Sequence, residues 1–186
     1  KANQAAITLT ATPSTVTYNA TTPATSTITI ATGSPTSSGA KSYAIDPASA
    51  GISSVNASTG VATAIMPGTC VIVGTVAGNG TYNDITGTVS LIINKASQAS
   101  VVTVSANRTV LASSDSTSLI VTAAGGSGTG AYVYGTSSPT VCSVDSVSGV
   151  VTAVSIGNCF VTAYRMGDSY YNQTSASSPI TITVTK

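Results

Sequence analysis

Apolar and polar residues alternate strictly in many short stretches of the chain, such as residues 7–11, 27–30 and 180–184. Successive side chains of a β-strand point to opposite faces of a sheet, so a period of two predicts strands with one buried face. Val, Ile and Thr carry much of the pattern, and all three favour pleated strands. The same regularity argues against a disordered, hydroxyl-rich stalk.

Clusters of Gly, Pro, Asn and Ser separate these stretches. In the first half of the chain we expect strands near residues 5–11, 15–18, 25–31, 41–45, 52–56, 60–65, 69–77 and 86–93. In the second half we expect them near 99–105, 108–112, 117–123, 130–134, 140–144, 149–154, 158–166 and 178–185. So many short strands, with turn signals every 8–12 residues or so, predict antiparallel sandwiches. Gly60 and Gly149 end two predicted hairpin turns, where positive φ is required.

The chain also repeats itself. KANQ at Lys1 returns as KASQ at Lys95, and residues 54–83 align without a gap to residues 143–172. We therefore expect two repeats, 1–94 and 95–186, with almost no linker between them. Both repeats end on a similar strand and a Lys, so Lys186 stands where a third repeat would begin. This predicts a slice of a longer array.

The second repeat carries a specific pattern, C-S-V-x(4)-G-V-V-T-A-V-x-x-G-x-C-x-V-T-A-x-x-x-G-x-x-x-Y-N, from Cys142 to Asn172. Together with the K-A-x-Q openings, it resembles the bacterial immunoglobulin-like (Big-type) tandem repeats of large surface adhesins and other exported multidomain proteins. The resemblance covers both repeats. It implies an all-β fold of two tandem antiparallel immunoglobulin-like β-sandwich domains, an extracellular place at the bacterial cell surface, and a spacer or adhesive role without one fixed ligand.

Charge and hydropathy limit the kinds of partner that the chain can bind. Only 6% of residues are charged, 42% are hydrophobic and the net charge is +1, so there is no basic field for nucleic acid or anionic lipid. No apolar run approaches the roughly 20 residues of a membrane span, and no secretion leader opens the chain. We expect no nucleic-acid partner and no membrane span in this segment.

Catalytic side chains are scarce. The sequence has no His, and its five acidic residues are all Asp, so a Ser or Cys nucleophile lacks the usual general base. We predict that the segment is not an enzyme and takes no cofactor. Two minority alternatives use Lys41: a Ser–Lys arrangement, or an isopeptide bond to an Asn or Asp, for which only Asp46 or Asp84 could replace the catalytic Glu that the chain lacks.

Metal binding is also disfavoured, because the Asp residues are scattered singly and no calcium-loop motif occurs. Asp84 and Asp168 lie near two Tyr turns and could join a weak interdomain ion site. Ordinary turn capping is the favoured interpretation of both. We therefore expect no metal site.

Three cysteines remain. Cys142 and Cys159 lie in neighbouring predicted strands, and a disulfide there would close a loop of about 18 residues, worth roughly 3 kcal/mol. Cys70 aligns with Cys159, but Ser53 stands where Cys142 would be, so Cys70 is predicted to be an unpaired thiol. A reactive or intermolecular thiol is one interpretation, and a buried, inert residue is the favoured one.

Tyr82 and Tyr171 occupy matching G-x-x-x-Y-N loops and are candidate surface or interdomain contacts. Exposed rings could bind sugars, but the repetition favours rings packed at the end of a sandwich or against the next domain. Alternating Thr residues, such as Thr27 and Thr29, invite comparison with ice-binding surfaces. The outward face of any sheet produces the same string.

The leading functional hypothesis is a non-catalytic structural or adhesive repeat module of a bacterial cell-surface adhesin or extracellular fibre, which spaces or presents a binding region. One alternative is a glycan-binding or spacer module of an exported polysaccharide-degrading enzyme. Another is a self-assembling extracellular filament subunit. The expected partners are neighbouring repeats of the same polypeptide, with host or surface glycans and proteins as further candidates.

Overall fold

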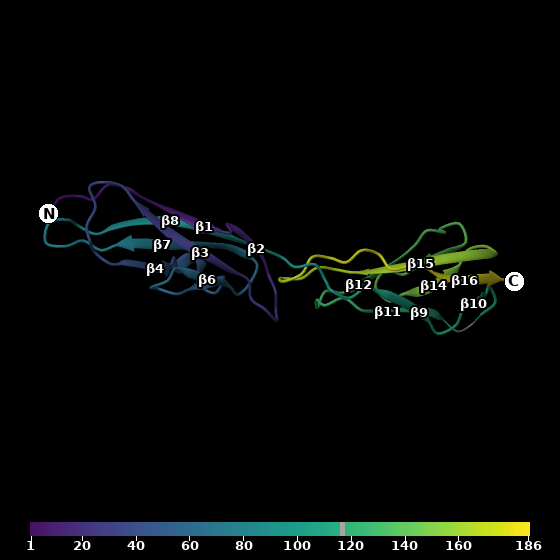
Figure 1. Cartoon of the computed structure of the whole chain (residues 1–186). Coiled ribbons are helices and arrows are strands. Elements are labelled where there is room, and N and C mark those ends of the chain that lie inside the picture. The colour runs from purple at the N-terminus through teal and green to yellow at the C-terminus, as the bar shows by residue number, and fades with distance from the viewer. Residues whose placement is uncertain (116–117) are drawn as a thin grey trace. The chain divides into compact units, whose positions relative to one another are not determined.

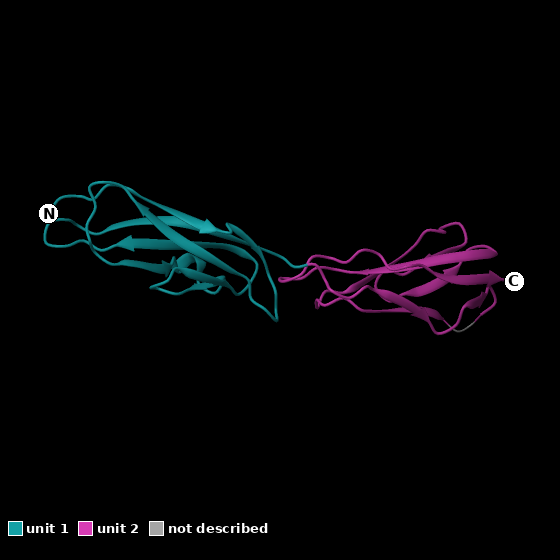
Figure 2. Ribbon diagram, viewed as in Figure 1, with its two compact units in different colours: residues 1–96 teal, residues 97–186 magenta. Residues whose placement is uncertain are grey.

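The computed structural model describes residues 1–115 and 118–186 (Figure 1). The chain divides into two compact units, residues 1–96 and 97–186 (Figure 2). Each unit holds two four-stranded sheets, so each is a β-sandwich with immunoglobulin-like layers. The last strand of the first unit ends at Asn94, and the division therefore falls inside the KASQ segment.

The first unit pairs its strands in the sheet orders β1-β3-β6-β5 and β2-β8-β7-β4. The strands are β1 (Ile7–Thr12), β2 (Thr15–Thr17), β3 (Thr25–Thr32), β4 (Lys41–Ile45), β5 (Ser53–Val55), β6 (Val61–Ala64), β7 (Gly68–Val76) and β8 (Ile85–Asn94). A short 3₁₀ helix that the alternation did not predict, η1 (Pro47–Ser49), lies between β4 and β5. The Asp46 carboxylate caps it by accepting the N–H of Ala48 at 2.9 Å.

The second unit repeats this arrangement, with the sheet orders β13-β14-β11-β9 and β10-β16-β15-β12. Its strands are β9 (Thr103–Ala106), β10 (Val110–Ala112), β11 (Leu119–Ala124), β12 (Tyr132–Thr136), β13 (Cys142–Val144), β14 (Val150–Ala153), β15 (Gly157–Arg165) and β16 (Ile180–Thr185). All strand pairs are antiparallel except β2 with β8 and β10 with β16, which are parallel.

The parallel pairs arise because the first two strands of each unit belong to different sheets. In the first unit β1 pairs with β3 in one sheet, and β2 crosses to pair with β8 in the other. Pro13 stands between β1 and β2, and its ring nitrogen has no hydrogen to continue a ladder. The peptide bond Thr12–Pro13 is cis.

Each unit has its own core, built from the inward positions of both sheets. Ile28, Ile72 and Leu91 are at most 1% exposed in the first unit. Leu119, Val161 and Ile182 are fully buried in the second. Burying one such side chain contributes about 1.5–3 kcal/mol, so two separate cores give each unit its own source of stability.

The two predicted hairpin turns are confirmed. Gly60 has φ 72° and Gly149 has φ 71°, a region that other residues rarely adopt. A Cβ would lie 2.4 Å from the Ile28 carbonyl oxygen at Gly60 and 2.1 Å from the Val121 carbonyl oxygen at Gly149. Only glycine lets these hairpins approach the neighbouring strand.

Several strands of the second unit are shorter than the alternation predicts, β9 and β16 among them. β9 begins at Thr103 rather than near residue 99, and β16 begins at Ile180 rather than near 178. The hydroxyls of Ser177 and Thr174 accept the N–H groups of β15 residues Ala163 and Arg165, so side chains replace strand pairing there. The predicted strand 117–123 begins at Thr117, which lies outside the described residues.

Candidate functional site

The cysteine pair of the second unit is a disulfide. Cys142 starts β13 and Cys159 lies in β15, so the bridge joins the two sheets across the core, with the Cα atoms 5.8 Å apart. Both cysteines are fully buried. The bridge therefore ties the two layers together.

Ser53 and Cys70 occupy the same place in the first unit. Ser53 pairs with Ala64, as Cys142 pairs with Ala153, and Cys70 pairs with Leu91, as Cys159 pairs with Ile182. The Ser53 hydroxyl contacts the Cys70 sulfur. Cys70 is a free thiol with no exposed surface, so a solvent-borne reagent has no access to it in the folded unit.

The Tyr82 and Tyr171 loops are held by matching turns. Asn79 Oδ1 accepts the N–H groups of Thr81 and Tyr82, at 2.8 and 3.0 Å. Asp168 Oδ1 takes the place of the Asn79 amide oxygen in the second unit and accepts the N–H groups of Tyr170 and Tyr171, at 2.8 and 2.9 Å. Both Tyr82 and Tyr171 are half-buried, and their roles as surface or interdomain contacts stay a prediction.

Asp168 also fastens a second loop, because its other oxygen accepts the Thr129 N–H at 2.6 Å. The Thr129 and Tyr170 N–H groups, together with those of Tyr171 and the Thr129 hydroxyl, lower the pKa of Asp168 to about 2. Asp145 likewise caps the hairpin before Gly149. The Ser148 N–H and hydroxyl and the Val147 N–H lower its pKa.

Asp84 accepts the Gly78 N–H at 2.7 Å, so it too caps a turn. Across residues 1–115 and 118–186, the Cys and Asp side chains nowhere gather in a group of three or more that could hold a metal ion. Lys41 donates from Nζ to the Ile30 carbonyl at 2.7 Å. Lys41, Asp46 and Asp84 thus each bond to backbone groups.

Sequence reasoning overlooked the glutamine of each K-A-x-Q opening. The Gln4 amide nitrogen donates to the carbonyls of Val76 and Asn83, at 3.2 and 2.7 Å, and its oxygen accepts the Ser37 N–H at 2.8 Å. Gln98 repeats the arrangement, donating to Met166 and Asn172 and accepting from Gly128. The repeated Gln in both openings could have indicated a structural role for this residue. Its hydrogen-bond partners lie far away in the sequence, so only the fold identifies them.

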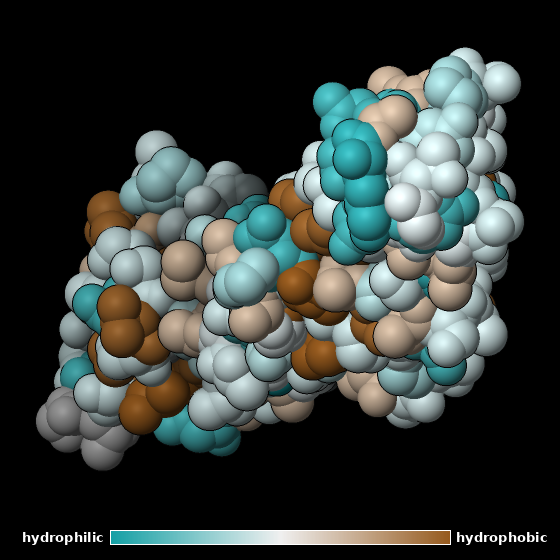
Figure 3. Space-filling model, turned by 90° about the vertical axis from the view of Figure 1, so that its left-hand side faces the viewer, coloured by the Kyte–Doolittle hydropathy of each residue, from teal (hydrophilic) through white to brown (hydrophobic). Residues whose placement is uncertain are grey.

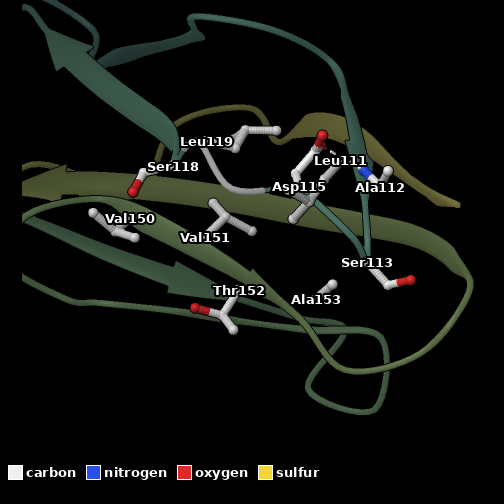
Figure 4. Close-up of a pocket in the computed structure, with 10 residues that line it drawn as sticks. All are labelled: Leu111, Ala112, Ser113, Asp115, Ser118, Leu119, Val150, Val151, Thr152 and Ala153. Carbon is white, nitrogen blue, oxygen red and sulfur yellow. Dashed lines mark hydrogen bonds between the residues drawn. The ribbon is translucent and has the colours of Figure 1, made fainter. Parts of the chain in front are cut away.

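A hollow of about 220 Å³ lies between β10, β11 and β14 of the second unit, lined by Leu111, Leu119, Val151 and others (Figure 4). Its one carboxylate belongs to Asp115, whose Oδ2 forms a salt bridge with Arg108 Nη1 at 2.9 Å and also accepts the Ala112 N–H. The other polar groups labelled in the figure are hydroxyls of Ser and Thr. This lining offers space for a small group and no acid–base pair among the described residues.

The two units differ at this hollow. Tyr18 follows β2, its N–H donates to Asn94, and its ring packs against the first core. Ser113 follows β10 in the same way, with its N–H donating to Thr185. A small residue thus stands in the second unit where an aromatic ring stands in the first.

The outward faces of the sheets carry hydroxyl and small apolar side chains. Figure 3 views the molecule from one end, where hydrophobic residues form small groups separated by pale and hydrophilic residues. On β1 and β3 the outward positions are nearly all Thr, and the Thr10 and Thr29 hydroxyls bond to each other at 2.6 Å. No helix among the described residues has the length and apolar character needed to cross a membrane.

No protein-family model matches the sequence, and no curated protein is similar to it. Solved structures with a similar fold include human protocadherin-24 EC1-2, with 11% identity, a TM-score of 0.43, and coverage of 98% of this chain and 97% of that one. Mouse cadherin-23 EC22-24 has 15% identity and a TM-score of 0.42, with coverage of 92% of this chain. The present chain spans 61% of that fragment's length.

Murine CEACAM1b is a further match, with 12% identity, a TM-score of 0.42, and coverage of 97% of this chain and 100% of that one. These identities and scores carry no functional argument. The fold assignment rests on the strand order, the two cores and the inter-sheet disulfide: the chain is a pair of immunoglobulin-like β-sandwiches.

Proposed function

We propose that the two units are non-catalytic structural repeats of an adhesin or fibre at the bacterial cell surface, where they space or present a binding region. The observation that carries the proposal is the repetition of a complete unit. Each sandwich has its own core and its own Gln clamp, by which we mean the hydrogen bonds of the Gln4 or Gln98 side chain to two distant loops. Neither unit needs strands from the other to complete its sheets. Such units can be added in series without redesign.

The side chains support a structural role. The charged residues described above bond to backbone groups. Lys41 donates to a carbonyl of β3, and Asp84, Asp145 and Asp168 accept N–H groups of turns and loops. The disulfide of the second unit suits an oxidising compartment outside the cytoplasm. The resemblance to bacterial immunoglobulin-like repeats is consistent with this location.

Replacing both units within the protein that carries them tests the proposal. A spacer acts through its length, so two unrelated sandwich domains of equal size should preserve cell attachment, whereas deletion of residues 1–186 should reduce it. A matched control deletes only residues 97–186 and should give an intermediate effect. If equal-length replacement abolishes attachment, the units themselves hold a ligand site and the spacer role is wrong.

A further inference from the structure

The outer face of the β10-β16-β15-β12 sheet carries the single Phe of the chain. Phe160 is 38% exposed and lies beside Thr181 in the register of β15 and β16. We define the Phe160 face by six outward residues: Val110, Gly135, Asn158, Phe160, Thr162 and Thr183. Of the other five residues only Thr162 and Thr183 carry a hydroxyl, and an exposed aromatic ring among them is a feature that the spacer role does not use.

Next to the Phe160 ring the face has a shallow depression at Gly135, which we call the dent. Gly135 on β12 pairs with Thr162, two residues along β15 from Phe160. No atom outside its immediate chain neighbours lies within 4 Å of the place where a Gly135 Cβ would stand. The Phe160 ring therefore leaves the dent open in its own molecule.

The first unit has neither feature. Val71 follows Cys70 as Phe160 follows Cys159, and Ala44 pairs with Val73 as Gly135 pairs with Thr162. The large residue and the missing side chain thus occur together, in the second unit only. A knob and a hole on one face are what a two-fold interface needs, since each copy must offer both halves of the contact.

Charge does not oppose such pairing. The outward positions of β10, β12, β15 and β16 hold no Asp, Lys or Arg. Arg165, at the end of β15, is turned to the carbonyls of Gly125, Gly126 and Gly130. A net charge of +1 adds little repulsion between copies.

We propose that two copies of this chain associate through their Phe160 faces, with each Phe160 ring seated over Gly135 of the other copy. The proposal deepens the structural role by naming a lateral partner. Four strands about 4.8 Å apart and about 20 Å long offer roughly 400 Å² per copy, half of what a standard interface buries. A single pair should therefore be weak, and neighbouring repeats in an array would strengthen it.

Sedimentation of the whole chain from about 10 µM to about 1 mM tests this. We expect reversible dimers near the upper limit, with little change between low and high salt because no charges meet. Phe160→Ser should raise the dissociation constant at least about tenfold, as loss of a central aromatic anchor does. Gly135→Val should do the same by filling the dent, while the Val favours the strand and so maintains folding.

Val71→Ser is the matched control, at the corresponding position of the first unit, and should leave association unchanged. A monomer at all concentrations would overturn the proposal, as would equal weakening by Val71→Ser. Binding of a neutral polysaccharide by the monomer, lost in Phe160→Ser, would also overturn it and assign the face to glycan. None of these outcomes depends on the domain-replacement experiment, so the spacer role can fail or hold separately.

Discussion

Single residues distinguish the two units at the inter-sheet bridge. Cys142 and Cys159 are bonded, while Ser53 contacts Cys70 at the corresponding place. The spacing of Cys142 and Cys159 made a disulfide predictable, but the expectation that they lie in neighbouring strands was wrong, because β14 lies between β13 and β15 in the chain and the bridge joins opposite sheets. That Ser53 faces Cys70 across the first core follows only from the register of β5, β6 and β7.

We expect Ser53→Cys to form a second disulfide, since its partner sulfur already lies in contact. Closing a loop of this length should stabilise the first unit by about 3 kcal/mol, and its melting temperature should rise by roughly 10 °C or more. Intact mass with and without reductant, together with calorimetry, checks both points. Cys142→Ser should destabilise the second unit by a similar amount. Two free thiols in the oxidised Ser53→Cys variant would contradict the prediction.

At the scale of elements, period-two alternation predicted most strands well, including β4 at the expected residues and β7 within one residue at each end. It failed where backbone groups found side-chain partners. Ser177 and Thr174 bond to β15 and shorten β16, and the Asp46 cap starts a 3₁₀ helix. Alternation reports which face is buried, but it does not report such local hydrogen bonds.

The Gln4 clamp fastens the opening segment to two loops distant in sequence. Gln4→Ala should lower the free energy of unfolding of the first unit by about 1–3 kcal/mol, because the buried carbonyl of Val76 and the part-buried carbonyl of Asn83 lose their donor. Denaturant unfolding measures this. Asn3→Ala, which changes the exposed neighbour, should cost less than about 0.5 kcal/mol. Equal effects of the two substitutions would show that the clamp contributes nothing.

At the scale of the whole molecule, the two units should respond differently to acid. Asp145 and Asp168 hold turns in the second unit, where Asn56 and Asn79 hold the same turns in the first. An amide does not titrate. Only the second unit therefore loses these two turn caps by protonation.

The direction of the pH effect on stability follows from the lowered pKa values of both carboxyls in the folded state. Their stabilisation is present above the ordinary value of 3.8 and is lost as the pH falls through the folded pKa, about 2 for Asp168. Amide resonances of Thr129 and Ser148 should shift only as the pH falls below the ordinary carboxyl pKa, with a midpoint near pH 2 for Thr129, and those of Thr81 and Ser58 should not shift. Asp168→Asn should abolish the Thr129 shift. A shift that persists in this variant would assign the titration to another group.

The amino-acid sequence by itself determined that this chain is all-β, that it repeats, that Cys142 and Cys159 can pair, and that acid–base chemistry has few side chains to use. These properties are local or additive: alternation, spacing and composition are visible without folding. Tertiary structure alone decided what lies across a sheet or between loops. Strand register brings together residues that lie far apart in the sequence. It therefore decided the Gln clamps, the Ser53–Cys70 contact, the hollow of the second unit where Ser113 replaces Tyr18, and the open space at Gly135 beside Phe160.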